Sequence, residues 1–138
     1  MVATAGTLGA AVAALSHTNV RDAAHRPTKD AVLLRDTVQA VPEQTSLVVQ
    51  LSTGGSVHDP LEKRLTVLDA EPDSCSLTCG TTNFGDDVFL NPYPFMAQPY
   101  QPAQARRIVP EFALFDPGHR AALPRRVGPS AVPYHHPL

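Results

Sequence analysis

Short apolar runs alternate with segments of helical periodicity along the first part of the chain. Residues 10–15 form one apolar run, and residues 47–51 form a second that is rich in β-branched side chains and is closely followed by a glycine pair. Apolar runs of this length that end in turn residues are typical of buried strands. Between them, residues 30–41 carry apolar side chains at helical spacing. The pattern therefore predicts a strand, a helix and a second strand in that order.

A second helix and a third strand are predicted after the glycine pair. Asp59 would supply an N-cap carboxylate, Pro60 the first helical position and Glu62 the acid three residues after the cap. This order is typical of a capping box at the start of a helix. We expect the helix to end near Asp69 and a strand to follow over residues 74–78.

Proline divides the chain into two parts. Of the 14 prolines, those from Pro92 onward are the more closely spaced, and they interrupt a stretch where a further helix would be expected. Residues 112–115 are a candidate for the fourth strand. Repeated alternation of strand and helix predicts the α/β class, with parallel βα units and right-handed crossovers. An α/β barrel and a doubly wound sheet both fit this pattern.

Composition and charge exclude several classes of protein. The chain has 138 residues, the size of one domain, and a net charge of −2 without a basic stripe, so we expect no nucleic-acid partner. No window approaches the roughly 18 apolar residues of a membrane span, and residues 1–15 lack the positive region of a signal peptide. Cys75 and Cys79 would lie about 13 Å apart on a strand, too far for a disulfide. We therefore predict a cytoplasmic protein with no membrane partner.

Polar residues stand where the predicted strands end, which is where reacting groups gather in α/β proteins. His17 and Asn19 follow the first strand and are two positions apart, so both side chains would point the same way, as a metal pair or a substrate clamp requires. The alternative is a lone histidine beside a turn-forming asparagine, since asparagine is a poor zinc ligand.

The second strand ends in Ser52-Thr53-Gly54-Gly55, which offers hydroxyls and unobstructed backbone N–H groups. Such a turn suits a carboxylate or a phosphate, although a plain βα turn explains it equally well. The third strand ends at Thr78, another hydroxyl.

A family resemblance runs through the same region. It rests on many residues at matching spacing over residues 48–89, with shorter matches upstream and downstream in the same order. The matching stretches are Val48-Val49-Gln50-Leu51-Ser52-Thr53-Gly54-Gly55, Lys63-Arg64-Leu65, Pro72, Leu77, Gly80-Thr81 and Asn83-Phe84-Gly85-Asp86-Asp87-Val88-Phe89, flanked by Val20-Arg21-Asp22, Arg26-Pro27, Val109-Pro110-Glu111, Phe115-Asp116 and Gly118-His119. In these residues the chain resembles the β-keto acid cleavage enzyme family, which includes 3-keto-5-aminohexanoate cleavage enzyme.

The resemblance implies a fold and an activity. Members of the family are zinc-dependent (β/α) barrels that condense a β-keto acid with acetyl-CoA and release acetoacetate and a new acyl-CoA. On this basis residues 1–119 would form a partial (β/α)8 TIM-type barrel of about four βα units, and residues 120–138 an irregular segment rich in proline, arginine and histidine. The implied partners are a small-molecule β-keto acid and acetyl-CoA, with a second copy of the chain in a homo-oligomer.

The resemblance also implies roles for single residues. The family's metal pair falls on His17 and Asn19, so the first zinc ligand is kept and the second is replaced. Catalytic roles fall on Ser52, Ser76 and Glu111. The implied substrate-binding residues are Ser52, Thr53, Gly54, Gly55, Ser76 and Thr78.

Two departures from the family bear on activity. Ala113 stands where the family commonly has an acid. The family chain is also longer, and its later half supplies a third zinc ligand together with a catalytic aspartate and arginine. We therefore expect zinc binding to be weak or lost. The alternative to an active enzyme is a truncated or frame-shifted remnant without catalytic activity, that is, a pseudoenzyme or an interaction module.

Overall fold

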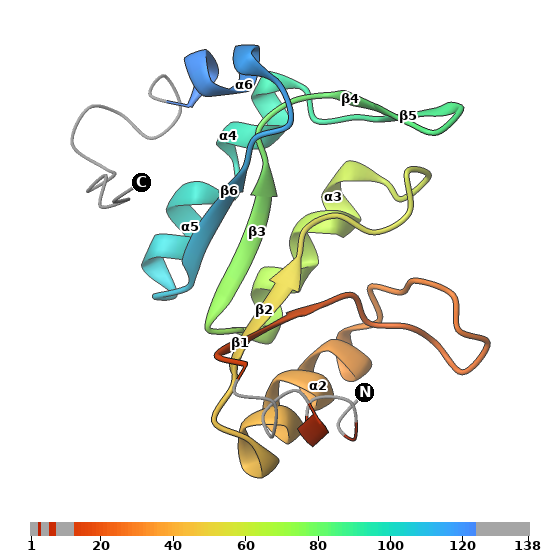
Figure 1. Ribbon diagram of the computed structural model, residues 1–138, viewed down its shortest axis with the longest axis vertical. Helices are drawn as coiled ribbons and strands as arrows, with labels where there is room; N and C mark the ends of the chain where they lie inside the picture. The colour runs from red at the N-terminus through yellow and green to blue at the C-terminus, as the bar shows by residue number, and fades with distance from the viewer. Residues whose placement is uncertain (1–2, 4–5, 8–12, 124–138) are drawn as a thin grey trace.

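The computed structural model of the protein describes residue 3, residues 6–7 and residues 13–123, and Figure 1 shows how their elements are arranged. Four strands form one parallel sheet in the order β1-β2-β3-β6. Their bounds are Leu15–Thr18 for β1, Val48–Ser52 for β2, Ser74–Thr78 for β3 and Val109–Ala113 for β6. The register places His17 beside Gln50 and Ser76 beside Glu111.

Helical segments connect the first three strands. α2 (Ala31–Gln44) links β1 to β2, while α3 (Leu61–Leu65) and the 3-10 helix η1 (Thr66–Ala70) link β2 to β3. The carboxylate of Asp30 accepts hydrogen bonds from two backbone N–H groups in the first turn of α2. This side chain fixes the start of the helix, because those N–H groups have no acceptor within it.

The connection from β3 to β6 begins with a hairpin. Its antiparallel strands are β4 (Thr82–Phe84) and β5 (Asp87–Phe89), and Gly85 turns the chain between them with a φ of 64°. The short helices α4 (Tyr93–Ala97) and α5 (Tyr100–Ala105) follow, and α6 (Pro117–Ala122) comes after β6. The two strands that the hairpin adds are separate from the main sheet.

The hydrophobic core lies between the parallel sheet and the helices. Its main cluster of buried residues takes members from α2, η1 and α5 as well as from β2 and β3, so these helical segments cover the same face of the sheet. The cluster consists of Val20, Leu34, Leu51, Val67, Leu68, Cys75, Leu77, Ala103 and Ile108. Because side chains alternate along a strand, Gln50, Ser52, Ser74 and Ser76 point to the opposite face.

The observed architecture is mixed α/β with a parallel sheet of four strands, as the sequence predicts. Helices on one face of this sheet are compatible with part of a (β/α) barrel, whereas a doubly wound sheet carries helices on both faces. In the described part of the chain, no helix is both long enough and apolar enough to cross a membrane. Cys75 and Cys79 are buried thiols and do not form a disulfide.

Most element boundaries lie close to their predicted positions. The strand predicted over residues 74–78 is confirmed residue for residue as β3, and the helix predicted over residues 30–41 is confirmed as α2, which continues to Gln44 through Pro42. The first strand begins only at Leu15, and residues 10–12 of the predicted run lie outside the described residues. The fourth strand begins at Val109 instead of residue 112.

One local prediction, the capping box at Asp59, is wrong. Its carboxylate accepts a hydrogen bond from the N–H of Ser56, at 3.0 Å, instead of capping the helix. α3 starts after Pro60 without a side-chain cap. The short loop from Ser56 to Asp59 closes on itself, which leaves the carboxylate pointing back toward the end of β2.

The proline-rich stretches contain more helix than an irregular segment would. Pro94 and Pro102 lie in the first turns of α4 and α5, where a missing backbone N–H removes no helical hydrogen bond. Of the segment predicted to be irregular, residues 120–122 belong to α6, and residues 124–138 lie outside the described residues.

Candidate functional site

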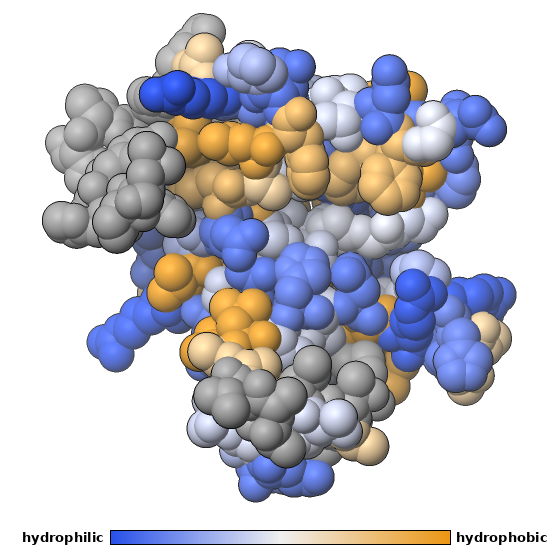
Figure 2. All heavy atoms as spheres, viewed as in Figure 1, coloured by the Kyte–Doolittle hydropathy of each residue, from blue (hydrophilic) through white to orange (hydrophobic). Residues whose placement is uncertain are grey.

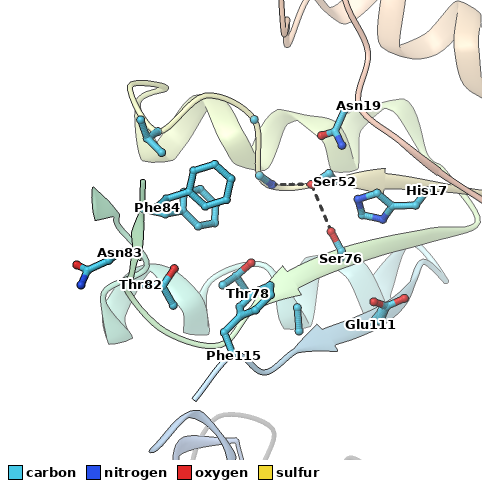
Figure 3. A pocket seen from close by; sticks show the side chains of 15 residues that line it. His17, Asn19, Ser52, Ser76, Thr78, Thr82, Asn83, Phe84, Glu111 and Phe115 are labelled. Atoms are coloured by element: carbon cyan, nitrogen blue, oxygen red, sulfur yellow. Dashed lines mark hydrogen bonds between the residues drawn. The ribbon is translucent and has the colours of Figure 1, made fainter. Parts of the chain in front are cut away.

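A cavity of about 600 Å³ opens at the carboxyl ends of the four parallel strands (Figure 3). Each strand contributes to it, and the hairpin and the loop after β2 form its far wall. The lining residues are His17, Asn19, Ser52, Gly54, Gly55, Val57, Ser76, Thr78, Thr82, Asn83, Phe84, Phe89, Glu111, Ala113 and Phe115. Its volume is in the range of small-molecule sites.

A hydrogen-bonded chain of three side chains crosses the polar end of this cavity. Gln50 is 1% exposed, and its Nε2 donates to Glu111 Oε2 at 2.9 Å and to Ser74 Oγ at 3.0 Å. Its Oε1 is hydrogen-bonded to His17 Nδ1. Because the amide oxygen can only accept, Nδ1 of His17 carries the proton, and Nε2 is the ring nitrogen left to act as an acceptor. We call His17, Gln50 and Glu111 the head end of the cavity.

Two serine hydroxyls meet at the centre of the cavity. Ser76 Oγ donates to Ser52 Oγ at 3.4 Å, and the N–H of Gly54 donates to the same oxygen at 3.1 Å. Ser52 Oγ therefore accepts two hydrogen bonds, so its own proton is available to a ligand. A Cβ at residue 54 would lie 2.9 Å from Ser52 Oγ, which explains the glycine at this position.

A buried lysine supports the glycine turn, which we define as residues 52–55. Lys29 Nζ donates to the carbonyl oxygen of Ser52 at 2.8 Å. Burial lowers the pKa of Lys29 to about 8, while the nearby carboxylate of Asp59 opposes that shift. Gly55 has a φ of 152°, and a Cβ there would lie 2.5 Å from Asp59 Oδ2 and 3.1 Å from Lys29 Cε. The turn can therefore approach its supporting charges only because residue 55 has no side chain.

Arg64 joins the glycine turn to the far wall of the cavity. It is 2% exposed, and its Nε donates to the carbonyl of Thr53 at 2.8 Å. Its two terminal nitrogens donate to the carbonyl of Leu90 at 2.7 Å and to Asn91 Oδ1 at 2.6 Å, just after the hairpin. The guanidinium also lies 4.3 Å from the centre of the Phe89 ring. One side chain thus fixes the position of the hairpin relative to the serine site.

Aromatic side chains line the end of the cavity opposite His17 and Glu111 (Figure 3). Phe84 and Phe89 belong to the hairpin and their ring centres are 6.3 Å apart, while Phe115 follows β6. We call these three residues the aromatic end. Figure 2 shows apolar surface across the molecule at the level of the hairpin.

The described residues do not by themselves form a complete zinc site. His17 and Asn19 line the same cavity, as their spacing predicts. However, no group of three or more His, Cys, Asp or Glu side chains suited to a metal gathers among the described residues. Protein zinc sites use at least three side-chain ligands, whereas this pair offers one imidazole nitrogen and one amide oxygen.

The structure brings together nearly all of the residues singled out in the sequence. His17, Asn19, Ser52, Gly54, Gly55, Ser76, Thr78 and Glu111 all line the cavity. Thr53 is the exception, because its hydroxyl donates to the carbonyl of Ser76 at 2.6 Å and supports the turn from behind.

Sequence reasoning missed the head-end glutamine, the two buried cations and the aromatic end. Gln50 carries a signal in hindsight, since it is a polar residue inside an apolar strand. Lys29 carries none, because surface loops are ordinarily rich in lysine, and Arg64 lies in a stretch that matches the family but has no role assigned from the sequence. The aromatic end depends on how the hairpin folds back over the sheet.

Comparisons with known proteins place this geometry in context. A family model described as beta-keto acid cleavage enzyme matches residues 1–134. The 3-keto-5-aminohexanoate cleavage enzyme of Fusobacterium nucleatum is 33% identical over 108 residues, which cover 77% of this chain and 40% of that protein. The enzyme of the same name from Acetoanaerobium sticklandii is 37% identical over 81 residues, covering 57% of this chain and 30% of that protein. The chain thus spans less than half of the length of these curated relatives.

Proposed function

The chain belongs to the beta-keto acid cleavage enzyme family, and from that membership we propose that its cavity binds a β-keto acid for carbon–carbon cleavage with acetyl-CoA. The observation that carries the proposal is the donor arrangement around Ser52. Its hydroxyl accepts from Ser76 and from Gly54, so it presents its proton to the cavity. A substrate carboxylate or keto oxygen is the natural acceptor for such a donor.

The head end would hold the reacting part of the substrate. Gln50 fixes the ring of His17 with Nε2 as its available nitrogen, and Glu111 fixes Gln50 in turn. Preorganised side chains of this kind support catalysis because they need not reorganise as charge develops on the substrate. Thr78 lines the same cavity and would add a further hydroxyl contact.

Zinc enters the proposal only through His17 and Asn19. These two residues would hold the metal weakly, and tight binding would require ligands from outside the described residues. When bound, zinc supplies Lewis-acid polarisation of a substrate oxygen. We also propose that the four-stranded sheet forms part of a (β/α)8 barrel whose site includes residues beyond this sheet.

A second candidate function is substrate binding without turnover, as in a pseudoenzyme. Asn19 favours it, since an amide replaces the imidazole expected in the metal pair. Ala113 favours it as well, because a methyl group lines the cavity where the family commonly has an acid. Binding alone does not accelerate a reaction when ground state and transition state are held equally well.

The experiment measures binding first and turnover second. Acetoacetate would be titrated into the purified chain by calorimetry, and the chain would then be incubated with zinc, acetyl-CoA and a panel of β-keto acids while acetoacetate release is followed. We expect Ser52→Ala to weaken acetoacetate binding about tenfold, as for loss of a hydrogen bond to a charged group. Ser46→Ala, at an exposed serine outside the cavity, should have no effect.

The two candidate functions give different outcomes. Acetoacetate release that is abolished by His17→Ala supports the enzyme, whereas saturable binding without release supports the pseudoenzyme. Absence of saturable binding, or binding that Ser52→Ala leaves unchanged, would exclude both.

A further inference from the structure

We propose that the aromatic end selects β-keto acids whose acyl chain is apolar and uncharged, and that it disfavours chains that carry an ammonium group. The inference rests on the proposed function, which places the reacting part of the substrate at the head end. It adds a substrate class and assigns the selection to Phe84, Phe89 and Phe115.

The cavity is polar at one end and apolar at the other. His17, Gln50 and Glu111 meet at the head end, and the paired hydroxyls of Ser52 and Ser76 lie between them and the aromatic end (Figure 3). A bound carboxylate near Ser52 would leave the rest of the molecule to extend toward the hairpin. An elongated ligand with a polar head and an apolar tail therefore fits the cavity in one orientation.

Two of the aromatic rings expose apolar surface that a bound ligand could cover. Phe84 and Phe115 are each 68% exposed although both line the cavity. Val57 and Ala113 add further apolar wall. Covering such surface with a hydrocarbon chain is favourable, and each buried methylene raises affinity about fourfold.

The charges behind the far wall disfavour a cation. Arg64 lies 4.3 Å from the centre of the Phe89 ring. Lys29 Nζ lies 3.5 Å from the point where a Cβ would stand if residue 55 had a side chain. Two positive charges thus stand behind this wall, against one carboxylate, Asp59. These three groups sum to one net positive charge, while the hairpin carboxylates Asp86 and Asp87 lie outside the cavity lining.

No carboxylate lines the aromatic end among the described residues. Glu111 is the acid that lines the cavity, and it lies at the head end and accepts a hydrogen bond from Gln50. Asp87 on the hairpin is outside the lining and faces His58, with 3.9 Å between Oδ2 and Nε2. An ammonium group on the acyl chain would therefore find no carboxylate partner at the aromatic end, and Arg64 already lies over the Phe89 ring, where a cation would otherwise be attracted.

The test is a series of β-keto acids that share one head group. Acetoacetate, 3-oxohexanoate and 3-oxooctanoate would be titrated by calorimetry into the full chain, with 5-amino-3-oxohexanoate as the cationic member. We expect affinity to rise about fourfold for each added methylene. The cationic compound should bind about tenfold more weakly than 3-oxohexanoate, because of the nearby positive charges.

Variants assign the selection to the aromatic end. Phe84→Ala and Phe115→Ala should flatten the rise with chain length, so that the longer compounds lose more affinity than acetoacetate does. Both side chains are exposed, so the folded state should persist, which circular dichroism checks. Val88→Ala is the matched control, because Val88 is an exposed hairpin residue outside the cavity lining.

Each remaining outcome would overturn the inference in a recognisable way. Equal affinity for all chain lengths, or preference for the cationic compound, rejects it while Ser52-dependent acetoacetate binding keeps the proposed function intact. A loss of acetyl-CoA affinity in Phe84→Ala with an unchanged chain-length series would assign the rings to the thioester instead. Absence of binding by every compound rejects the inference together with the proposed function.

Discussion

At the scale of the residue, Gln50 has a central position in the site. It is an amide in the middle of an apolar strand, and it connects β1, β3 and β6 through His17, Ser74 and Glu111. A buried amide is stable only when its donors and acceptors are satisfied, and two of the three partners here, His17 and Glu111, line the cavity. The same hydrogen bonds therefore stabilise the sheet and orient the head end.

Replacing Gln50 with leucine should affect both stability and the site. The side chain is similar in size, but its three partners would lose their hydrogen bonds, and we expect unfolding to become easier by about 1–3 kcal/mol. Urea denaturation measures this change, and the NMR signals of the His17 ring should shift as its orientation is lost. Gln39→Leu, at an exposed position of α2, is the control. Unchanged His17 signals in the variant would contradict the assigned role of Gln50.

Lys29 gives the chain a specific dependence on pH. Its pKa is about 8 in the folded chain, against an ordinary value of 10.5. Between these values the unfolded chain binds more protons than the folded chain, so this residue makes stability rise with pH, and its unfavourable contribution is complete and constant below that window. In urea unfolding from pH 7 to 10.5, the stability of the parent relative to Lys29→Met should therefore increase.

The control for Lys29 is a solvent-exposed lysine. Lys63→Met removes a charge from an exposed position of α3. The difference between Lys29→Met and the parent should change with pH more steeply than the difference between Lys63→Met and the parent. If the two differences change equally with pH, then burial does not lower the pKa of Lys29 in solution.

At the scale of the element, the sequence predicts the helices and strands but misses the conformation of the loop at Asp59 and the position of the hairpin. α2 follows from the helical spacing of its apolar residues, which is a local signal, and β3 stands where a strand is expected after the preceding helix. The capping box at Asp59 fails because the local pattern competes with a tighter turn that includes Ser56. The cluster at the strand ends was predictable because parallel strands share one carboxyl edge. The aromatic end was not, because it depends on the tertiary position of the hairpin.

Arg64 should control the position of the hairpin. Arg64→Met would leave three acceptors without this donor, two of them buried, and we expect a loss of roughly 3 kcal/mol in stability. Arg64→Lys should recover little of this loss, since an ammonium cannot reproduce the planar set of donors. Hydrogen exchange at the amides of β4 and β5 should accelerate more than exchange in β3. Lys63→Met is again the control. Uniform acceleration of hydrogen exchange in the whole sheet would mean that Arg64 stabilises the fold without positioning the hairpin.

At the scale of the whole molecule, the sheet has two outer strands. Within the described residues, β1 pairs only with β2 and β6 only with β3. Val109, at the start of β6, is 65% exposed. Unpaired strand edges with exposed apolar side chains favour association between chains. The isolated chain should therefore self-associate in a concentration-dependent way.

A single charge on the outer strand tests this expectation. Val109→Lys should lower the average mass measured by light scattering at high protein concentration, because a charged side chain hinders edge-to-edge pairing. Val32→Lys makes the same chemical change at a similarly exposed valine on α2. If the two variants lower the mass equally, surface hydrophobicity explains the association and the strand edge does not.

Alkylation of the two buried thiols would measure local unfolding of the chain. The thiolate is the nucleophile that attacks an alkylating reagent. Burial raises the pKa of Cys75 to about 11, so modification requires exposure of that part of the sheet. Cys75 belongs to the main core cluster, whereas Cys79 packs in a smaller cluster with Tyr100 and Leu123. Mass spectrometry of iodoacetamide labelling in native buffer should find Cys79 modified first. Labelling of Cys75 should follow only at the rate of global unfolding. The two labelling rates would then measure two separate opening events in the protein without any substitution.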